Sequence, residues 1–260
     1  MWFRGPLIIG CAGAEASSFG LEPVDVSTGA MGPKGTVAPP KTYEQVTEGV
    51  MLLLELEPEQ RAAAEELCAL YRASAAAHGG DVKPDRLWNE LTRDFTYGLL
   101  VARLADAHAL QQPKTFAYRS DRHVLRTEDP HHSLETSMTF GKFGGLRHNP
   151  AASLTACEQG ASRKLAPEEV DDDAIRLEAR YIRHWGNFAW RGDPNVDDGG
   201  AQAEGEARWP ARGAGGETLV FDAPSCRAGG REALPGQALW AWLGKHGLHE
   251  AYARAKARIL

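Results

Sequence analysis

The stretch GPLIIGC, residues 5–11, is a short, continuous apolar run bounded by glycine. A run of this length without polar alternation is typical of a strand that is buried on both faces of a parallel sheet. The segment that follows, AGAEASSFG (12–20), predicts a loop, and residues 21–40 hold too many glycines and prolines for regular structure. The first strand is therefore expected to lead into a long irregular segment.

Two further strands and several helices are predicted along the rest of the chain. KTFAYRSD (114–121) and ETLVFD (217–222) indicate strands. Helices are predicted from Tyr43 to about Glu55, from Pro58 to the Gly79-Gly80 pair, from Pro84 to about Ala109 with a candidate break near Gly98, over 167–190, and from about Pro235 onward. Residues 192–216 are rich in Gly, Asp and Ala and predict a loop.

The helix predicted over 167–190 has an apolar face. Its apolar residues recur at three- and four-residue steps, and they are Ala174, Leu177, Tyr181, Trp185 and Phe188. This periodicity predicts that the face, with Trp185 and Phe188, belongs to the core. Acidic residues gather in the first turns, where the helix dipole favours them.

Strands separated by long helical segments predict an α/β fold. Two or three strands make a small sheet, which would leave strand edges unpaired and apolar faces open unless further strands come from elsewhere. We therefore expect residues 1–260 to form a single domain that is one part of a larger sheet, with no separate second domain.

The composition limits the partners of the chain. A formal net charge of -6 and a pI near 5.9 argue against nucleic acid or an anionic membrane surface. No apolar run approaches the roughly 18 residues of a membrane span, and the apolar stretch near the N-terminus is too short for a signal peptide. A cytoplasmic location is the expectation.

Two segments have the order of residues found around a catalytic acid and a catalytic histidine. In PLIIGCAGAEASSFG (6–20), Glu15 lies five residues after Gly10. In HHSLETSMTFGKFGG (131–145), His132 is followed by Glu135 and then by Phe140-Gly141. Both resemble the type-B carboxylesterases, the cholinesterase-like branch of the α/β-hydrolases. The resemblance implies that Glu15 is the catalytic acid and that His132, rather than His131, is the catalytic histidine.

A third segment is the most specific match to the same family. HWGNFAWRGDPN (184–195), RWP (208–210) and ETLVFD (217–222) resemble the family's late helix, a Gly-Asp-Pro-Asn turn, a Trp-Pro pair and a short strand. Gly192 suits the end of a helix, and the residues after it suit a turn. The resemblance implies the C-terminal part of an α/β-hydrolase sheet with flanking helices, incomplete without an N-terminal half.

The nucleophile of such an enzyme is missing from these residues. No Gly-x-Ser-x-Gly elbow occurs in the 260 residues, and nothing places Ser133, beside His132, on a strand-to-helix elbow. The resemblance implies that a missing N-terminal half or a second polypeptide supplies the serine and the oxyanion hole. The chain would then act on a small-molecule ester only together with that partner, without a cofactor.

Two other functions fit parts of the sequence. Cholinesterase-like folds also serve as non-catalytic binding domains, although retention of Glu15 and His132 favours an enzyme. A metal-dependent hydrolase could use His123, His131, His132 and His148, which lie in one region. Neighbouring histidines point apart, however, and the four widely spaced cysteines show no zinc-binding pattern. Glu135 is interpreted as a structural ion-pair partner near the site.

Overall fold

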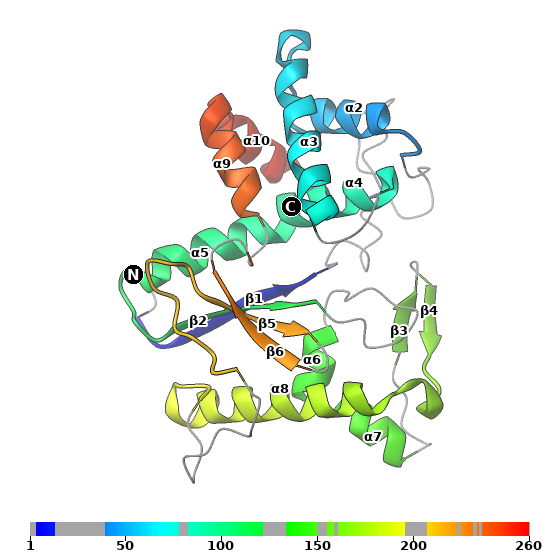
Figure 1. Cartoon of the computed structure of the whole chain (residues 1–260), viewed down its shortest axis with the longest axis vertical. Helices are drawn as coiled ribbons and strands as arrows, with labels where there is room; N and C mark the ends of the chain where they lie inside the picture. The colour runs from blue at the N-terminus through cyan, green and yellow to red at the C-terminus, as the bar shows by residue number, and fades with distance from the viewer. Residues whose placement is uncertain are drawn as a thin grey trace. The chain divides into compact units, whose positions relative to one another are not determined.

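The structure is a computed structural model of the chain (Figure 1), and it describes residues 4–13, 40–77, 83–121, 134–149, 155–158, 161–195, 207–222, 225–230, 233 and 236–259. The chain divides into two compact units. Unit 1 comprises Met1–Glu15 and Leu100–Pro235, and unit 2 comprises Ala16–Leu99 and Gly236–Leu260. The expectation of a single domain over 1–260 stays a prediction.

Unit 1 contains a four-stranded sheet. Its strands, in spatial order, are β1 (Leu7–Ala12), β2 (Thr115–Ser120), β5 (Thr218–Asp222) and β6 (Ser225–Gly229). The first three are parallel, and β6 returns antiparallel beside β5. The three predicted strands and the α/β class are confirmed.

Close contact between β1 and β2 requires a glycine. Gly10 pairs with Tyr118 across the two strands, and a Cβ atom at residue 10 would lie 2.3 Å from Cδ1 of the Tyr118 ring. Gly10 therefore occupies the position of β1 against which the Tyr118 ring packs.

Helices cover both faces of the sheet (Figure 1). On one face, Cys11 and Ala117 pack against Ala102 and Ala105 of α5 (Leu99–Ala109). On the other face, aromatic and aliphatic side chains pack against α8 (Asp172–Arg191). Successive residues of a strand point to opposite faces, so β2 places Phe116 and Tyr118 toward α8 and Ala117 toward α5.

Helix α8 follows the expected chemistry at both ends. The side chain of Asp171 accepts a hydrogen bond from the backbone N–H of Ala174, and Gly192 ends the helix with a φ of 68°. Three members of the predicted apolar face, Ala174, Leu177 and Tyr181, are buried. Trp185 and Phe188 are partly buried and pack against the same core.

Short elements complete unit 1. A 3-10 turn, η3 (Pro167–Glu169), precedes α8, and α6 (Leu134–Thr139) and α7 (Lys142–His148) lie beside it. The strands β3 (Thr155–Glu158) and β4 (Ala161–Lys164) form a separate antiparallel pair. Within the predicted loop 192–216, the described residues 192–195 and 207–216 form neither helix nor strand.

A buried arginine lies between α5 and the start of β5. The side chain of Arg212 is fully buried, and its Nε donates to Oδ1 of Asp106 at 2.8 Å. Its Nη1 donates to the carbonyl of Gly216 at 2.8 Å and to the hydroxyl of Thr218 at 3.1 Å. The carboxylate and these oxygen acceptors compensate the cost of burying the guanidinium.

Unit 2 is helical. Its elements are α2 (Tyr43–Leu53), η1 (Pro58–Gln60), α3 (Arg61–Ala77), α4 (Pro84–Arg93), the π-helical turn η2 (Asp94–Gly98), α9 (Gln237–His246) and α10 (His249–Ile259). Trp88 and Trp242 are the largest side chains in its core. Near Gly98, where a break is predicted, the chain stays helical, and the irregularity is the π-helical turn η2, which ends at Gly98.

Candidate active site

The carboxyl ends of β1 and β2 lie side by side. Ala12 pairs with Ser120, and the backbone N–H of Gly13 donates to the carbonyl of Ser120 at 2.6 Å. The segments that carry Glu15 and His132 begin at these two adjacent strand ends. In a parallel α/β sheet, this edge is where functional loops collect.

Most of the predicted site residues lie outside the described part of the chain. These are Glu15, His132, His131, Ser133 and His123. The roles of Glu15 and His132, and the distance between them, therefore stay predictions. The strands that lead to both residues are described, and they are adjacent and parallel.

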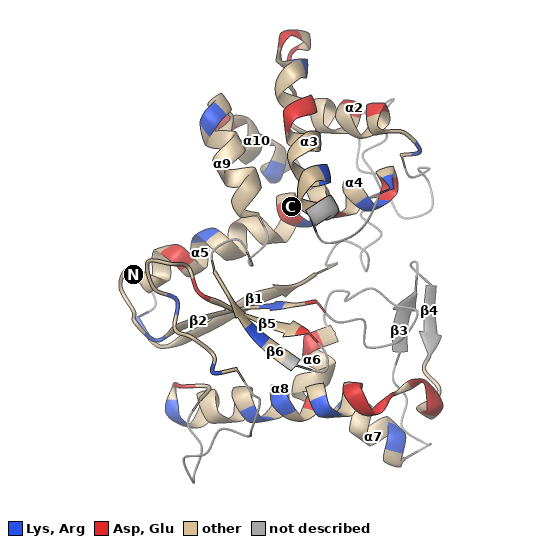
Figure 2. Cartoon of the chain, viewed as in Figure 1, with Lys and Arg blue, Asp and Glu red and all other residues tan. Residues whose placement is uncertain are grey.

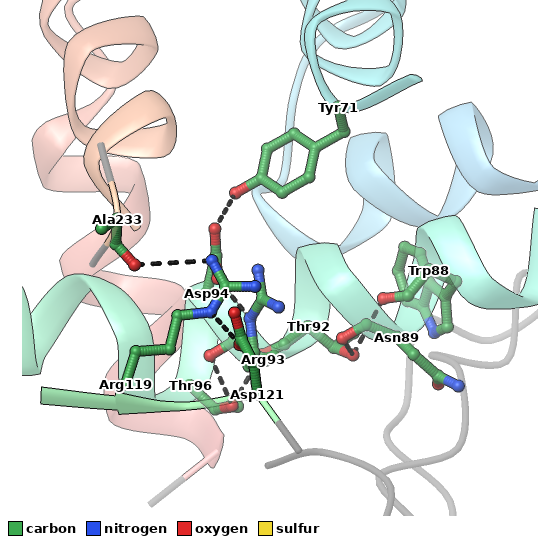
Figure 3. Close-up of polar contacts among 10 residues, drawn as sticks. All are labelled: Tyr71, Trp88, Asn89, Thr92, Arg93, Asp94, Thr96, Arg119, Asp121 and Ala233. Atoms are coloured by element: carbon green, nitrogen blue, oxygen red, sulfur yellow. Dashed lines mark hydrogen bonds and ion pairs between the residues drawn. The ribbon is translucent and has the colours of Figure 1, made fainter. Parts of the chain in front are cut away.

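Polar contacts fix the start of the segment that carries His132. Asp121 follows β2, and its backbone N–H donates to the carbonyl of Phe221 in β5 at 2.9 Å. Its side chain accepts from Arg119 in an ion pair, and Arg119 also donates to the carbonyl of Ala233 at 3.4 Å (Figure 3). These contacts hold the end of β2 before the chain leaves the carboxyl edge of the sheet.

Glu135 lies just beyond the same segment, in the first turn of α6. The Tyr118 hydroxyl donates to Glu135 Oε1 at 3.5 Å, which is a long hydrogen bond. The contact joins α6 to the strand from which the histidine segment leaves. It places Glu135 beside the carboxyl edge of β2, whereas its role as an ion-pair partner stays a prediction.

The side chain of Tyr181 in α8 is buried close to Ser120 and Glu135. Burial raises the pKa of Tyr181 well above its usual value, while the nearby Ser120 hydroxyl opposes this and the charge of Glu135 adds to it. The phenol is therefore neutral at neutral pH. Its ring stacks on Phe221 with the centroids 4.2 Å apart.

Glu178 of α8 anchors α7, the second helix after the histidine segment. Its two carboxylate oxygens accept hydrogen bonds from the backbone N–H groups of Phe143 and Gly144, each at 2.7 Å. These are two of the N–H groups that a helix leaves unpaired in its first turn. Burial raises the pKa of Glu178, and the two N–H donors oppose that shift.

The described residues give no support to a metal centre. His148 is exposed in the last turn of α7, and no group of three or more His, Cys, Asp or Glu among the described residues could hold a metal ion. The other three histidines of the proposed cluster lie outside those residues. Three of the cysteines, Cys11, Cys68 and Cys226, are buried.

The most specific sequence motif has a structural role. The side chain of Asn195 donates to the carbonyl of Trp209 at 2.8 Å and accepts from its backbone N–H at 2.7 Å. The Trp209 indole is buried and donates to the carbonyl of Ala117 in β2 at 2.9 Å. The Gly-Asp-Pro-Asn turn and the Trp-Pro pair therefore fasten the end of α8 to the central strands.

Unit 2 contains a buried polar cluster that the sequence analysis missed (Figure 3). Asp94, the first residue of η2, accepts from Tyr71 at 2.6 Å and from Nε of Arg93 at 2.6 Å. Burial, followed by the charge of Asp94, raises the pKa of Tyr71 well above its usual value. Burial lowers the pKa of Arg93, because it disfavours the charged form. The carboxylate of Asp94 outweighs that effect, so the pKa of Arg93 is raised overall.

The cluster coincides with the π-helical turn η2, a rare element that occurs mostly as a single turn inside an α-helix. The hydroxyl of Thr96 donates to the carbonyl of Thr92 at 2.6 Å, and Lys256 donates to the carbonyl of Thr96 at 2.5 Å. These contacts satisfy polar groups around the irregular turn. The sequence TRDF gives no sign that its arginine and aspartate are buried, because charged residues are mostly exposed in folded proteins.

Comparison with known proteins bears on the fold alone. No protein-family profile and no curated protein matches the sequence. The structure is similar to that of a thermophilic PNB esterase, with a TM-score of 0.51 and 19% sequence identity over 86% of this chain. The match spans 36% of the esterase chain. The likeness establishes an esterase-like α/β fold.

None of the described helices is long and apolar enough to cross a membrane.

Proposed function

We propose that the chain is the C-terminal portion of a type-B serine carboxylesterase and that it contributes Glu15 and His132 to a Ser-His-Glu triad. The observation that carries the proposal is the register of β1 and β2, whose last residues, Ala12 and Ser120, are direct partners. Glu15 lies three residues past one strand end and His132 twelve past the other. Both segments thus leave the same edge of the sheet.

Each residue has a defined chemical role in this proposal. His132 takes the proton of the serine hydroxyl as it attacks the ester carbonyl and then protonates the leaving alcohol. Glu15 accepts a hydrogen bond from the other ring nitrogen, which fixes the tautomer and stabilises the imidazolium. The order of acid and then histidine along the chain matches that of α/β-hydrolases.

The serine and the oxyanion hole come from a partner, either a preceding N-terminal half or a second polypeptide. Among the described strands, β1 pairs only with β2, so its other edge can receive a further strand. The apolar residues Leu7, Ile8 and Ile9 along this strand are only partly buried in unit 1. An added strand on that edge would bring the nucleophile to the side of the sheet nearest the Glu15 segment.

Affinity purification followed by active-site labelling tests the proposal. The tagged chain should copurify with a polypeptide that contains a Gly-x-Ser-x-Gly motif, and a fluorescent organophosphorus reagent should label that polypeptide only. Labelling should disappear in the His132→Ala complex and persist in the His131→Ala complex. Ester hydrolysis by the purified chain without a partner, or labelling of Ser133, would contradict the proposed division of the triad.

A further inference from the structure

Two small side chains lie at the carboxyl end of the sheet, on the face that α8 covers. Side chains of a strand alternate between the two faces, so Ser120 points to the same side of β2 as Tyr118. The residues paired with Ser120 are Ala12 in β1 and Phe221 in β5. The large ring of Tyr118 is thus followed, at the end of the strand, by a serine that lies beside an alanine.

Tyr181 of α8 reaches this end of the sheet. Its ring stacks on Phe221, the β5 residue that is paired with Ser120. Burial raises the pKa of the phenol, the Ser120 hydroxyl lowers it, and the charge of Glu135 raises it further. The phenol is therefore close to the Ser120 hydroxyl and within reach of the charge of a carboxylate.

The hydroxyls of Ser120 and Tyr181 are both buried without a hydrogen bond. The exposed fraction is 1% for Ser120 and 0% for Tyr181, and neither hydroxyl has a hydrogen-bond partner among the described residues. Although the two side chains are close, they do not hydrogen-bond to each other. A buried hydroxyl without a partner costs free energy, and nearly all buried polar groups pair with protein or with ordered water. Two such hydroxyls at one place therefore indicate one shared partner.

A water molecule suits the chemistry of this place. Buried waters occupy sites where several polar groups converge, whereas apolar cavities stay dry. The two lone pairs of a water can accept hydrogen bonds from the two hydroxyls. Its hydrogens are attracted by the negative charge of Glu135, the acidic residue in the first turn of α6 (Figure 2). One water can therefore pair with both hydroxyls at once.

We propose that unit 1 holds one buried water molecule between the hydroxyls of Ser120 and Tyr181. Because Ser120 is the last residue of β2 and Tyr181 lies in α8, the water joins a central strand to the helix that covers it. Its place is the strand end from which the histidine segment leaves. This inference does not rest on the proposed esterase function, since it concerns only residues of the described sheet and helices.

Thermal unfolding of the full chain, or of its complex with any copurifying polypeptide, tests the pairing of the two hydroxyls. If the phenol binds a water, Tyr181→Phe removes a hydrogen bond and should lower the melting temperature by roughly 2–4 °C. If the phenol has no partner, the same change removes a costly buried group and raises the melting temperature. Because one water serves both hydroxyls, Ser120→Ala combined with Tyr181→Phe should lower the melting temperature by less than the sum of the two single changes. A higher melting temperature for Tyr181→Phe, or additive losses, would overturn the proposal.

Magnetic relaxation dispersion of water oxygen, which counts the water molecules that a protein holds in its interior for long times, identifies the shared partner. The double variant should hold one long-lived water fewer than the wild-type chain. Tyr252→Phe is the matched control, because the buried Tyr252 hydroxyl donates to the carbonyl of Phe95 at 3.0 Å, and its loss should release no water. A crystal structure should show a water oxygen within about 2.5–3.0 Å of both hydroxyl oxygens. An unchanged number of long-lived waters in the double variant, or a protein group in that place, would refute the bound water.

Discussion

The carboxylate of Glu178 in α8 accepts a hydrogen bond from the backbone N–H of Gly144 in α7 at 2.7 Å, and the neighbouring N–H of Phe143 binds its other oxygen. The N-cap residue of α7, Gly141, has no side chain that could cap this turn. The second helix after the histidine segment, α7, is thus capped from a different helix.

Glu178→Ala should lower the free energy of unfolding of the chain by about 1–2 kcal/mol, because two backbone N–H groups lose their acceptor. The change is measured by urea denaturation followed by circular dichroism. Glu65→Ala, on the surface of α3, is a control expected to have a much smaller effect. Equal losses in the two variants would argue against a specific anchor.

The pH dependence of Glu178 has a defined sign. Burial raises its pKa in the folded chain above the ordinary value of 4.5, so the folded state binds the proton more tightly than the unfolded state. The stability contribution is therefore greatest below the unfolded pKa and falls as pH rises through the raised pKa. As the pH rises from the unfolded pKa through the raised folded pKa, the melting temperature of the wild-type chain should therefore fall relative to that of Glu178→Gln. An advantage that grows with pH would contradict the shift.

The buried Asp94 cluster should be a major determinant of the stability of unit 2. Asp94→Asn leaves the buried Arg93 without its opposite charge and should cost about 3–5 kcal/mol. Tyr71→Phe removes one hydrogen bond to Asp94 and should cost about 1–3 kcal/mol. Denaturant titration of both variants shows which substitution lowers the free energy of unfolding more. A larger loss for Tyr71→Phe would mean that Asp94 is held mainly by the phenol.

The two hydrogen bonds between the Asn195 side chain and the Trp209 backbone predict that the Gly-Asp-Pro-Asn turn stabilises the fold. Asn195→Ala should lower stability by about 1–3 kcal/mol, because the backbone of a buried residue loses two hydrogen bonds. Asn187→Ala removes a single long contact to the carbonyl of Pro194 and serves as the matched control. Thermal melts that rank Asn187→Ala as the more damaging change would disprove this role.

In the complex that carries the nucleophile, replacement of His132 should lower kcat by roughly three or more orders of magnitude, because the serine hydroxyl loses its base. His131→Ala should have a far smaller effect on ester hydrolysis. Steady-state kinetics with a small activated ester measures both. Comparable losses at the two positions, together with inhibition by chelators, would favour a metal site.

Glu15→Gln should leave the melting temperature of the complex nearly unchanged and still reduce kcat strongly, since an amide misorients the imidazole and cannot stabilise its charged form. The comparison of kcat with thermal stability separates this role from a structural one. Glu57→Gln provides a control at another glutamate, outside the proposed site. Retention of full turnover in Glu15→Gln would remove Glu15 from the triad.

The elements that could be predicted are those with a strong local pattern. The apolar run of β1 and the aromatic strand β2 both lie in the sheet, and the stripe of α8 gives an unambiguous helical period. Proline marked the start of α4, and glycine marked the end of α8. Such signals depend on nearby residues alone, so they can be read without the tertiary structure.

The parts that could not be predicted depend on distant partners. The strand β6 (SCRAG) pairs along one edge with β5 and lacks an apolar pattern, and the short helix α7 relies on Glu178 for its first turn. The burial of Asp94 depends on Tyr71, which is 23 residues away in sequence. For the candidate site, the sequence predicted which strands lead to the acid and to the histidine, and the structure adds that these two strands are neighbours.

The ion pair between Arg212 and Asp106 has a consequence for biosynthesis. The two residues are 106 positions apart, so Asp106 leaves the ribosome long before its partner is made. At typical elongation rates of about 5–20 residues per second, the wait is on the order of 5–20 seconds. During that interval, the end of α5 cannot complete its contact with the loop before β5. Nascent chains stalled before residue 212 should therefore be more sensitive to protease at α5 than chains released at full length.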